Sequence, residues 1–197
     1  MAYETKNFDH ILGTAGFSDT LLKNHFTLYQ GYVTNTNKLI ELMMSMVKEG
    51  KTGAPEFAEL KRRFGWEFNG MRLHELYFSN MSKEKTELSS NSKLYKKMVE
   101  TFGSGEDCEK AFRAVGSMRG IGWVLMCYDK EGDRLFHIWI NEHDVGHLAG
   151  VNILLVMDVF EHAYMVDYGI KRADYIDAFI KAINWNAVEK RFKEALE

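Results

Sequence analysis

Two long amphipathic segments near the start of the chain constrain its fold most. Apolar residues recur every three to four positions from about Ser18 to Lys48 and again from about Pro55 to Met81, which is the period of an amphipathic helix. Gly50 and Gly53 interrupt the pattern, and proline favours the first turn of a new helix. Two long helices with a short connection pack antiparallel. We therefore predict an N-terminal helical hairpin.

The pattern changes in the second half of the chain. After the polar stretch Ser82–Ser90, shorter helical patterns cover about Ser92–Phe102 and Gly105–Ser117. Three apolar, β-prone runs then follow: Gly122–Tyr128, Leu135–Ile140 and Ile153–Met157. Helical patterns return from Phe160 onward, including Arg172–Ile183 and Asn186–Leu196. The sequence predicts an α+β fold: a long helical hairpin domain (1–90), then a C-terminal α/β domain (91–197) with a small three-stranded antiparallel sheet.

Charge and composition exclude several classes of protein. The 197 residues include 25 Lys and Arg and 28 Asp and Glu, a formal net charge of −3, whereas a general nucleic-acid binder has a basic excess. No apolar run approaches the roughly 20 residues of a membrane span, and no secretory signal is visible. The two cysteines, Cys108 and Cys127, suit a reducing compartment. We expect a cytoplasmic protein that binds neither nucleic acid nor membrane.

Two histidines fall on the apolar faces of the predicted hairpin. His25 lies between Leu22 and Tyr29 on the first helix, and His74 occupies the corresponding face of the second. The hairpin would direct both rings into one interior, where each buried polar ring needs a partner. Each could be an ordinary core histidine bonded to a neighbour, or one metal ion could bind both.

A carboxylate and a third histidine follow the last β-prone run. Asp158 ends the run, and His162 comes four positions later, which would place both on one face of a helical turn. Asp158 could be a helix cap, but a carboxylate at the end of a buried strand is costly unless it is paired or binds a cation. With His25 and His74 the set has three imidazoles and one carboxylate, which suits iron, manganese or zinc rather than calcium or magnesium.

Several motifs resemble the iron/manganese superoxide dismutases. The run Met157–Tyr164 is similar to that family's signature Asp-x-Trp-Glu-His-Ala-Tyr, with Phe160 in place of tryptophan. Further similar segments occur in the family's order: Tyr32–Asn37, Phe68–Gly70, Leu73–Tyr77, Gly120–Trp123, Asp167–Tyr168, Arg172–Tyr175 and Asn184–Trp185. The resemblance covers about residues 15 to 195. It implies an enzyme that disproportionates superoxide to dioxygen and hydrogen peroxide.

The resemblance also implies a ligand set and a cofactor. Carried over position by position, it makes His25, His74, Asp158 and His162 the ligands of one iron or manganese ion per chain. The ion would alternate between the +3 and +2 states and keep a position for solvent. One carboxylate and three neutral imidazoles leave such a site net positive, which favours an anionic substrate.

Three neighbouring residues receive roles from the same resemblance. Tyr32 matches the tyrosine that lines the substrate funnel, and Trp123 matches an aromatic wall of the metal pocket. Glu161 matches a glutamate that bonds the last histidine ligand of a partner subunit, here His162, and so fixes its orientation. The resemblance therefore implies a homodimer or higher homo-oligomer with Glu161 and His162 at the interface.

The chain departs from the family where a glutamine usually bonds the solvent on the ion. Gly70 occupies the helix position that can carry this glutamine. In other relatives this glutamine comes from the loop after the sheet. The chain has His143 in that loop, as some relatives do, and His147 is the second candidate. We expect His143 to take the solvent-bonding role. Because this group tunes the reduction potential, the sequence does not separate iron from manganese.

The first helix departs from the family as well. His25 and Tyr32 are seven positions apart rather than the usual eight, and Asn24 stands at the usual spacing. Since asparagine is a poor ligand for this ion, we keep His25 and infer that a local helix irregularity has been removed. Leu28-Tyr29-Gln30 and Met165 replace residues that pair across the dimer in relatives. We expect the dimer contact or the substrate gateway to be rebuilt.

Two other functions fit parts of the pattern. The chain could be a non-enzymatic relative with a structural metal or an interaction role, which the altered gateway positions would favour. A mononuclear iron oxygenase would need two histidines and one carboxylate, and the fourth ligand argues against it. Because the net charge of −3 does not attract superoxide, local cations would have to steer it, and Lys23, Lys38 and Arg172 are the candidates.

Overall fold

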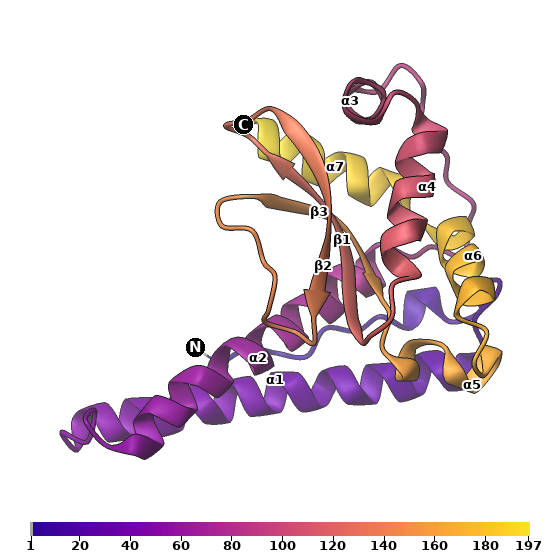
Figure 1. The fold of residues 1–197 in the computed structure, drawn as a ribbon. Coiled ribbons are helices and arrows are strands. Elements are labelled where there is room, and N and C mark those ends of the chain that lie inside the picture. The colour runs from indigo at the N-terminus through magenta and orange to yellow at the C-terminus, as the bar shows by residue number, and fades with distance from the viewer. Residues whose placement is uncertain (1) are drawn as a thin grey trace.

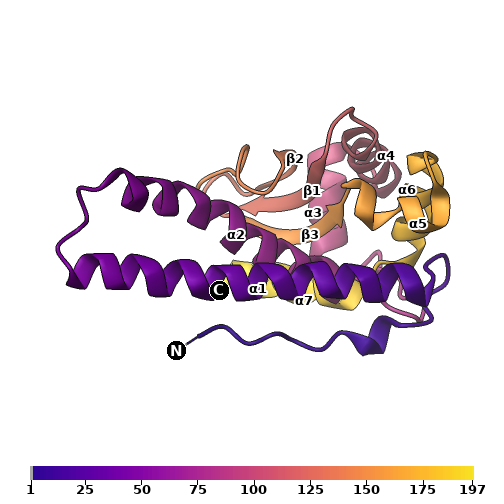
Figure 2. The ribbon, with the colours of Figure 1, turned by 90° about the horizontal axis from the view of Figure 1, so that it is seen from below.

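The predicted hairpin is present. The computed structural model describes residues 2–197, and helices α1 (Asp19–Lys48) and α2 (Pro55–Ser79) run side by side in opposite directions (Figures 1 and 2). The hydroxyl of Ser18 accepts from the amide of Leu21 and caps α1, as Ser at this position favours. The predicted end of the second helix at Met81 was wrong, because Met81 leaves the helix to form a β-bridge with Ile183.

Two shorter helices link the hairpin to the sheet. They are α3 (Lys93–Phe102) and α4 (Gly105–Gly116), close to the predicted ranges. Ser92 and Ser104 cap them, each accepting from a backbone amide three residues further on. Helix α4 packs against the first two strands.

The three predicted strands form one antiparallel sheet, which confirms the predicted α+β fold. The strands β1 (Gly122–Asp129), β2 (Arg134–Asn141) and β3 (Asn152–Asp158) take the order β2-β1-β3. Trp123 in the central strand is the register partner of Asp158 in β3. One end of the sheet therefore carries both residues side by side, and α2 packs on β3 next to them.

The chain after β3 is more broken than the helical pattern predicted. A 3₁₀ turn, η2 (Glu161–Ala163), and the single-turn helix α5 (Met165–Tyr168) precede α6 (Arg172–Ala182) and α7 (Trp185–Leu196). Gly169 ends α5 with φ +53°. The side chain of Asn184 accepts from the amide of Ala187 and caps α7.

The hairpin lies along one side of the sheet with its covering helices (Figure 1). The N-terminal segment runs alongside it (Figure 2), and Tyr3 exchanges two hydrogen bonds of 2.8 Å with the side chain of Asn37. The division into domains at residue 90 stays a prediction. Within residues 2–197, no helix combines the length and the apolar character that crossing a membrane requires.

Candidate metal centre

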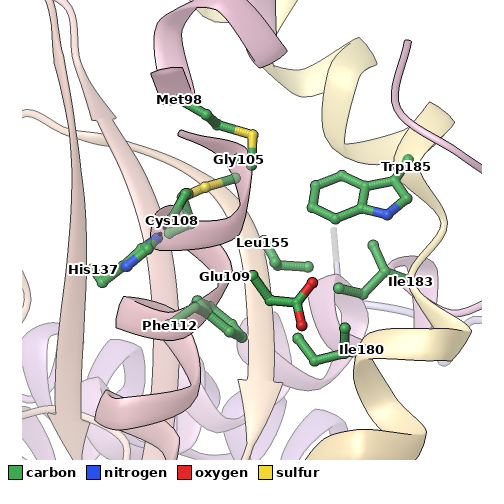
Figure 3. Close-up of a pocket in the computed structure, with 11 residues that line it drawn as sticks. Met98, Gly105, Cys108, Glu109, Phe112, His137, Leu155, Ile180, Ile183 and Trp185 are labelled. Atoms are coloured by element: carbon green, nitrogen blue, oxygen red, sulfur yellow. Dashed lines mark hydrogen bonds between the residues drawn. The ribbon is translucent and has the colours of Figure 1, made fainter. Parts of the chain in front are cut away.

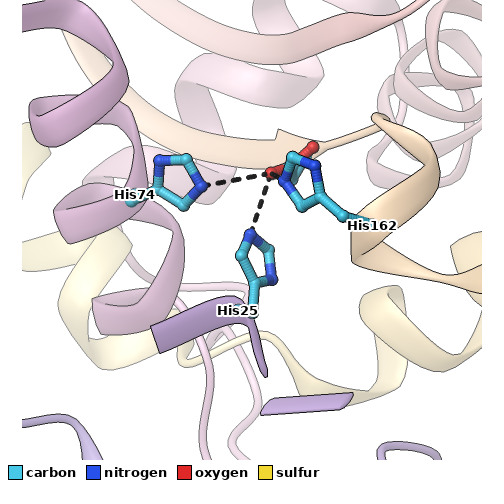
Figure 4. Close-up of side chains that lie close together, drawn as sticks. His25, His74 and His162 are labelled. Carbon is cyan, nitrogen blue, oxygen red and sulfur yellow. Dashed lines mark hydrogen bonds and ion pairs between the residues drawn. The ribbon is translucent and has the colours of Figure 1, made fainter. Parts of the chain in front are cut away.

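Four side chains from four separate segments converge on one point. They are His25 of α1, His74 of α2, Asp158 at the end of β3 and His162 of η2, and one ligand atom of each lies within 4.8 Å of the others. Oδ2 of Asp158 is 3.1 Å from Nε2 of His25, 3.1 Å from Nε2 of His162 and 3.8 Å from Nε2 of His74. The three rings approach this carboxylate from different sides (Figure 4).

The ring of His74 is oriented for a metal ion. Its Nδ1 lies 2.6 Å from the carbonyl oxygen of Gly70, and since a carbonyl only accepts, Nδ1 carries the hydrogen. Nε2 is then bare, fully buried and without a hydrogen-bond partner among the described residues. Buried polar atoms normally have partners, and a histidine ligand normally donates its outer N–H in this way. The residues present therefore fit a bound metal ion.

The two carboxylate oxygens of Asp158 have different tasks. Oδ1 accepts from the amide of Phe160 at 2.8 Å, whereas Oδ2 faces the three histidines. The alternative interpretation of Asp158 as a helix cap was wrong, because Phe160 is the cap residue of the following 3₁₀ turn and no side chain caps it. The expected shared helical turn with His162 was wrong, because Asp158 belongs to β3 and His162 to a 3₁₀ turn. A reversal of the chain brings them together instead.

His25 rather than Asn24 enters this cluster. Helix α1 continues without a break through both residues, and it exposes Asn24 and buries His25. The ring of His25 packs edge-on against Phe78, with 5.0 Å between centroids, and lies 5.2 Å from Tyr77. Its Nδ1 is buried without a hydrogen-bond partner in the described chain, so this packing and the bond between Nε2 and Asp158 orient the ring.

Burial and mutual charge set the protonation of the cluster. Burial lowers the pKa of His25 and, more strongly, that of His74, so both rings are neutral. Burial alone would raise the pKa of Asp158, but His162 and His25 lower it overall. Burial likewise opposes protonation of His162, yet the carboxylate of Asp158 raises its pKa overall. A metal ion would compete with the proton of His162 and with the hydrogen that Nε2 of His25 donates to Asp158, whereas Nε2 of His74 is already bare.

Tyr32, Trp123 and His143 form a hydrogen-bonded chain beside the cluster. The indole N–H of Trp123 donates to Nδ1 of His143 at 3.0 Å, and Nε2 of His143 lies 2.8 Å from the hydroxyl of Tyr32. Trp123 also packs edge-on against His74, with 4.9 Å between centroids. His147 hydrogen-bonds the backbone of this loop, with Nε2 at 2.9 Å from the carbonyl oxygen of His143.

Burial keeps the side chains of His143 and Tyr32 neutral. It lowers the pKa of His143 to about 4 and raises the pKa of Tyr32. The ring of Tyr32 packs directly on Gly70, which has no side chain. A Cβ at position 70 would lie 2.5 Å from Cδ1 of Tyr32. A glutamine at this helix position is therefore incompatible with the present place of Tyr32.

Trp66 also belongs to this site, although the sequence did not indicate it. Its ring lies 4.4 Å from that of His143 and 5.5 Å from that of Tyr32. With Tyr32 and Arg63, Trp66 lines a surface hollow of about 230 Å³ between α1 and α2. Trp66 stands between a glycine and a glutamate in the sequence, so no apolar periodicity or known motif singled it out.

The predicted steering cations lie in different settings. Lys23 and Lys38 are exposed. Arg172 instead donates to the carbonyl oxygens of Met118 and Gly120 at 2.7 Å each. Arg172 therefore stabilises the segment that precedes β1, which is a structural role.

The gateway substitutions also have distinct places. Leu28 and Met165 are 44% and 46% exposed, respectively. Tyr29 points inward and donates from its hydroxyl to the carboxylate of Glu75 at 3.0 Å. Glu161 is exposed, and His162 has 25% of its side chain exposed, whereas the other three cluster residues are fully buried.

Comparison with known proteins decides the family. The model of the iron/manganese superoxide dismutases, C-terminal domain, matches residues 90–191. The chain belongs to the iron/manganese superoxide dismutases. An iron superoxide dismutase of Saccharolobus solfataricus is 33% identical over 171 residues, which are 85% of this chain and 81% of that protein. One of Aquifex pyrophilus is 35% identical over 92% of this chain and 87% of its own length.

The relatives include enzymes of both metals. A manganese superoxide dismutase of Haloferax volcanii is 33% identical over 88% of this chain and 85% of that protein. Iron and manganese enzymes thus match at similar identity, so similarity alone does not assign the metal. The family and the α+β fold expected from the sequence motifs are confirmed.

Proposed function

We propose that this chain, as a superoxide dismutase, converts two superoxide anions and two protons into one dioxygen and one hydrogen peroxide at a single iron or manganese ion. His25, His74, Asp158 and His162 would hold the ion. The observation that carries this proposal is the convergence of three imidazoles and one carboxylate within 4.8 Å, beside the Tyr32–His143 pair.

The ligand set suits the chemistry of that reaction. When bound, iron or manganese supplies a one-electron couple between the +3 and +2 states. Neutral His25 and His74 and a single ionised Asp158 leave the centre net positive, which favours an anionic substrate. The buried setting strengthens this attraction because few water molecules screen it.

Tyr32 and His143 would take part in proton transfer during the reaction. Because Nδ1 of His143 accepts from Trp123, its Nε2–H donates to the hydroxyl of Tyr32. The hydroxyl hydrogen of Tyr32 is then not used in this bond and can be donated to solvent or substrate near the ligands. Since both nitrogens of His143 are used in these bonds, His143 would act on the solvent of the ion through Tyr32, in place of the glutamine that Gly70 excludes.

The ligand that reaches the surface supports a homodimer. His162 is partly exposed next to the exposed Glu161, and a partner's glutamate could bond its outer nitrogen and fix the ring. The exposed apolar side chains of Leu28, Met165 and Val166 could be covered by the same partner. We further propose that the enzyme works in the cytoplasm, which suits its two unpaired cysteines.

The two other functions have less support. A purely structural metal would not require the hydrogen-bonded pair of half-buried Tyr32 and buried His143 next to the ligands. A mononuclear iron oxygenase needs open positions for an organic substrate, and here a fourth side chain joins the cluster.

The test combines metal analysis with activity. The metal-free protein is reconstituted separately with iron and with manganese, and metal content and superoxide dismutation are measured. We expect about one ion per chain and activity with at least one metal, both lost in His74→Ala. His10→Ala, which changes an exposed histidine, serves as the matched control. Stoichiometric metal without activity in the unmodified protein would favour the non-enzymatic function.

A further inference from the structure

The loop that carries His143 is short and conformationally demanding. It follows β2, and the amides and carbonyls of Asn141 and Val145 bond each other at 2.8 and 3.3 Å, closing the loop. Glu142, its first residue after β2, has φ +50°, a left-handed conformation that non-glycine residues adopt rarely and at a cost in free energy. Something outside the loop must hold this conformation.

One such contact comes from α2, beside the bond from the amide of Glu142 to the carbonyl oxygen of Ile121 at 3.3 Å. The indole N–H of Trp66 donates to the carboxylate of Glu142 at 2.9 Å, across 76 positions of sequence. A charged acceptor makes such a bond stronger than a neutral pair would. The same indole packs edge-on against His143, with 4.4 Å between centroids and an interplanar angle of 81°. Trp66 thus touches the loop at both Glu142 and His143.

Trp66 is itself held in place. The guanidinium of Arg63 lies 3.8 Å from the centre of its ring, a distance at which the cation and the aromatic face attract each other. Arg63 is in turn paired at 2.7 Å with Glu67, which is buried. These contacts hold the half-buried indole on α2 against the loop.

We propose that Trp66 and Glu142 form a positioning pair that fixes the loop so that His143 reaches Trp123 and Tyr32 at once. This inference rests on the proposed function, because it gives the pair a purpose in the dismutase reaction. Both bonds of His143 require its ring to lie within a few tenths of an ångström of its present place. Trp66 acts through His143 and does not contact the cluster ligands, so it is a positioning and not a catalytic residue.

The experiment compares variants of the full-length protein. Trp66→Phe removes the N–H donor and keeps an aromatic ring, Glu142→Ala removes the acceptor, and Glu142→Gln keeps an acceptor oxygen. Trp185→Phe is the matched control, since Trp185 lies at the start of α7 and lines a different cavity. Amide hydrogen exchange of residues 141–145 is measured in the metal-free protein. Metal content, kcat and the visible absorption are measured in the loaded protein.

We expect Trp66→Phe and Glu142→Ala to speed exchange of the loop amides by about tenfold or more. Exchange in β1 and α2 should stay unchanged. In the loaded protein these variants should lower kcat and shift the absorption at unchanged metal content. Glu142→Gln should restore most of each property, and Trp185→Phe should match the unmodified protein.

Three results would overturn the proposal. The first is unchanged exchange of the loop in Trp66→Phe, and the second is faster exchange spread over the whole protein. The third is faster exchange of the loop with full kcat and unaltered absorption, which would separate the pair from His143. Failure of the proposed function looks different: the unmodified loaded protein would be inactive, while the exchange and absorption changes would still support the positioning pair.

Discussion

The indole N–H of Trp123 donates to Nδ1 of His143 at 3.0 Å, and this bond decides where His143 carries its hydrogen. An indole nitrogen only donates, so Nδ1 must be bare. The neutral ring then has its hydrogen on Nε2, which faces the hydroxyl of Tyr32 at 2.8 Å. One residue in the sheet thereby orders a hydrogen-bond chain that ends beside the metal ligands.

Replacing His143 with glutamine tests this chain. Glutamine can accept from Trp123 with its carbonyl and donate to Tyr32 with its amide, so His143→Gln should fold normally. Glutamine is smaller than histidine and places its N–H donor at a different point. We therefore expect activity to change by about tenfold, and the ratio of iron to manganese activity to change as well. Activity of each reconstituted form and the melting temperature are measured.

The control for that variant is His147→Gln. His147 hydrogen-bonds the loop at a backbone carbonyl, so its replacement should leave the activity ratio unchanged. If His143→Gln keeps both activity and metal preference, the role assigned to His143 is wrong. If only His147→Gln changes them, His147 and not His143 has the solvent-bonding role.

A side chain at position 70 should displace Tyr32. The added Cβ would lie 2.5 Å from Cδ1 of Tyr32, which forces a shift. We expect Gly70→Ala to lower the free energy of unfolding by about 1–3 kcal/mol, as overpacking usually does, and to reduce activity. Urea unfolding and the superoxide assay measure the two effects.

Gly53→Ala is the matched control for Gly70→Ala, because a Cβ there meets nothing within 4 Å. Gly70→Gln would place the glutamine of other relatives at its usual helix position. If that variant retained stability and activity, Tyr32 would be free to move and the steric argument would fail.

The sequence predicted the parts of this structure that have a local signal. The apolar period of α1 and α2 indicated the hairpin and placed His25 and His74 on its inner faces. The ends of the helices were less predictable, because the end of α2 depends on a bridge between Met81 and Ile183. Likewise, the 3₁₀ turn at His162 follows from the tertiary position of Asp158 and not from periodicity.

The site was predicted as far as its residues belong to motifs. The four ligand candidates stand in segments that resemble the family, and they do converge. The bond between Trp66 and Glu142 joins positions 76 apart, and neither residue belongs to a local pattern. Tyr29 occupies a position that resemblance links to a subunit contact, and its hydroxyl instead bonds the buried Glu75, a partner that the sequence motifs do not indicate.

Removing the carboxylate of Glu161 should weaken the proposed dimer. Glu161 is exposed and adjacent to His162, so within one chain it has no buried structural role. If it bonds a partner's histidine, Glu161→Ala should raise the dimer dissociation constant by at least about tenfold and loosen the metal. Sedimentation equilibrium and metal retention during dialysis measure this. Equal dissociation constants for Glu161→Ala and the unmodified protein would refute the contact, and Glu189→Ala on α7 serves as control.

Both cysteines should be inert in the folded protein. Burial raises the pKa of Cys108 and of Cys127 to about 12 each, and alkylation requires the thiolate. Cys108 lies in the apolar pocket of Figure 3 between Met98 and Phe112. We expect iodoacetamide at pH 8 to label neither thiol in the native protein and both in urea. Rapid labelling of native Cys108 would show that the pocket opens.

The same pocket should make stability depend on acid through His137. Nε2 of His137 lies 3.6 Å from Sγ of Cys108, and its ring stacks on Phe102 with 4.5 Å between centroids. Burial lowers the pKa of His137 to about 4, below the roughly 6.5 of an unfolded chain. The unfolded state therefore binds more protons between these values, and the free energy of unfolding falls as the pH drops from about 6.5 to about 4.

The substitution His137→Phe keeps a ring against Phe102 and removes the titrating group. In the metal-free protein we expect it to reduce the loss of stability between pH 6.5 and pH 4 by about 2 kcal/mol, whatever it does to stability at pH 7. Urea unfolding of both proteins across this range gives the two slopes. Parallel slopes would mean that His137 titrates in the folded protein as it does in the unfolded chain, and that water reaches the ring that the structure buries.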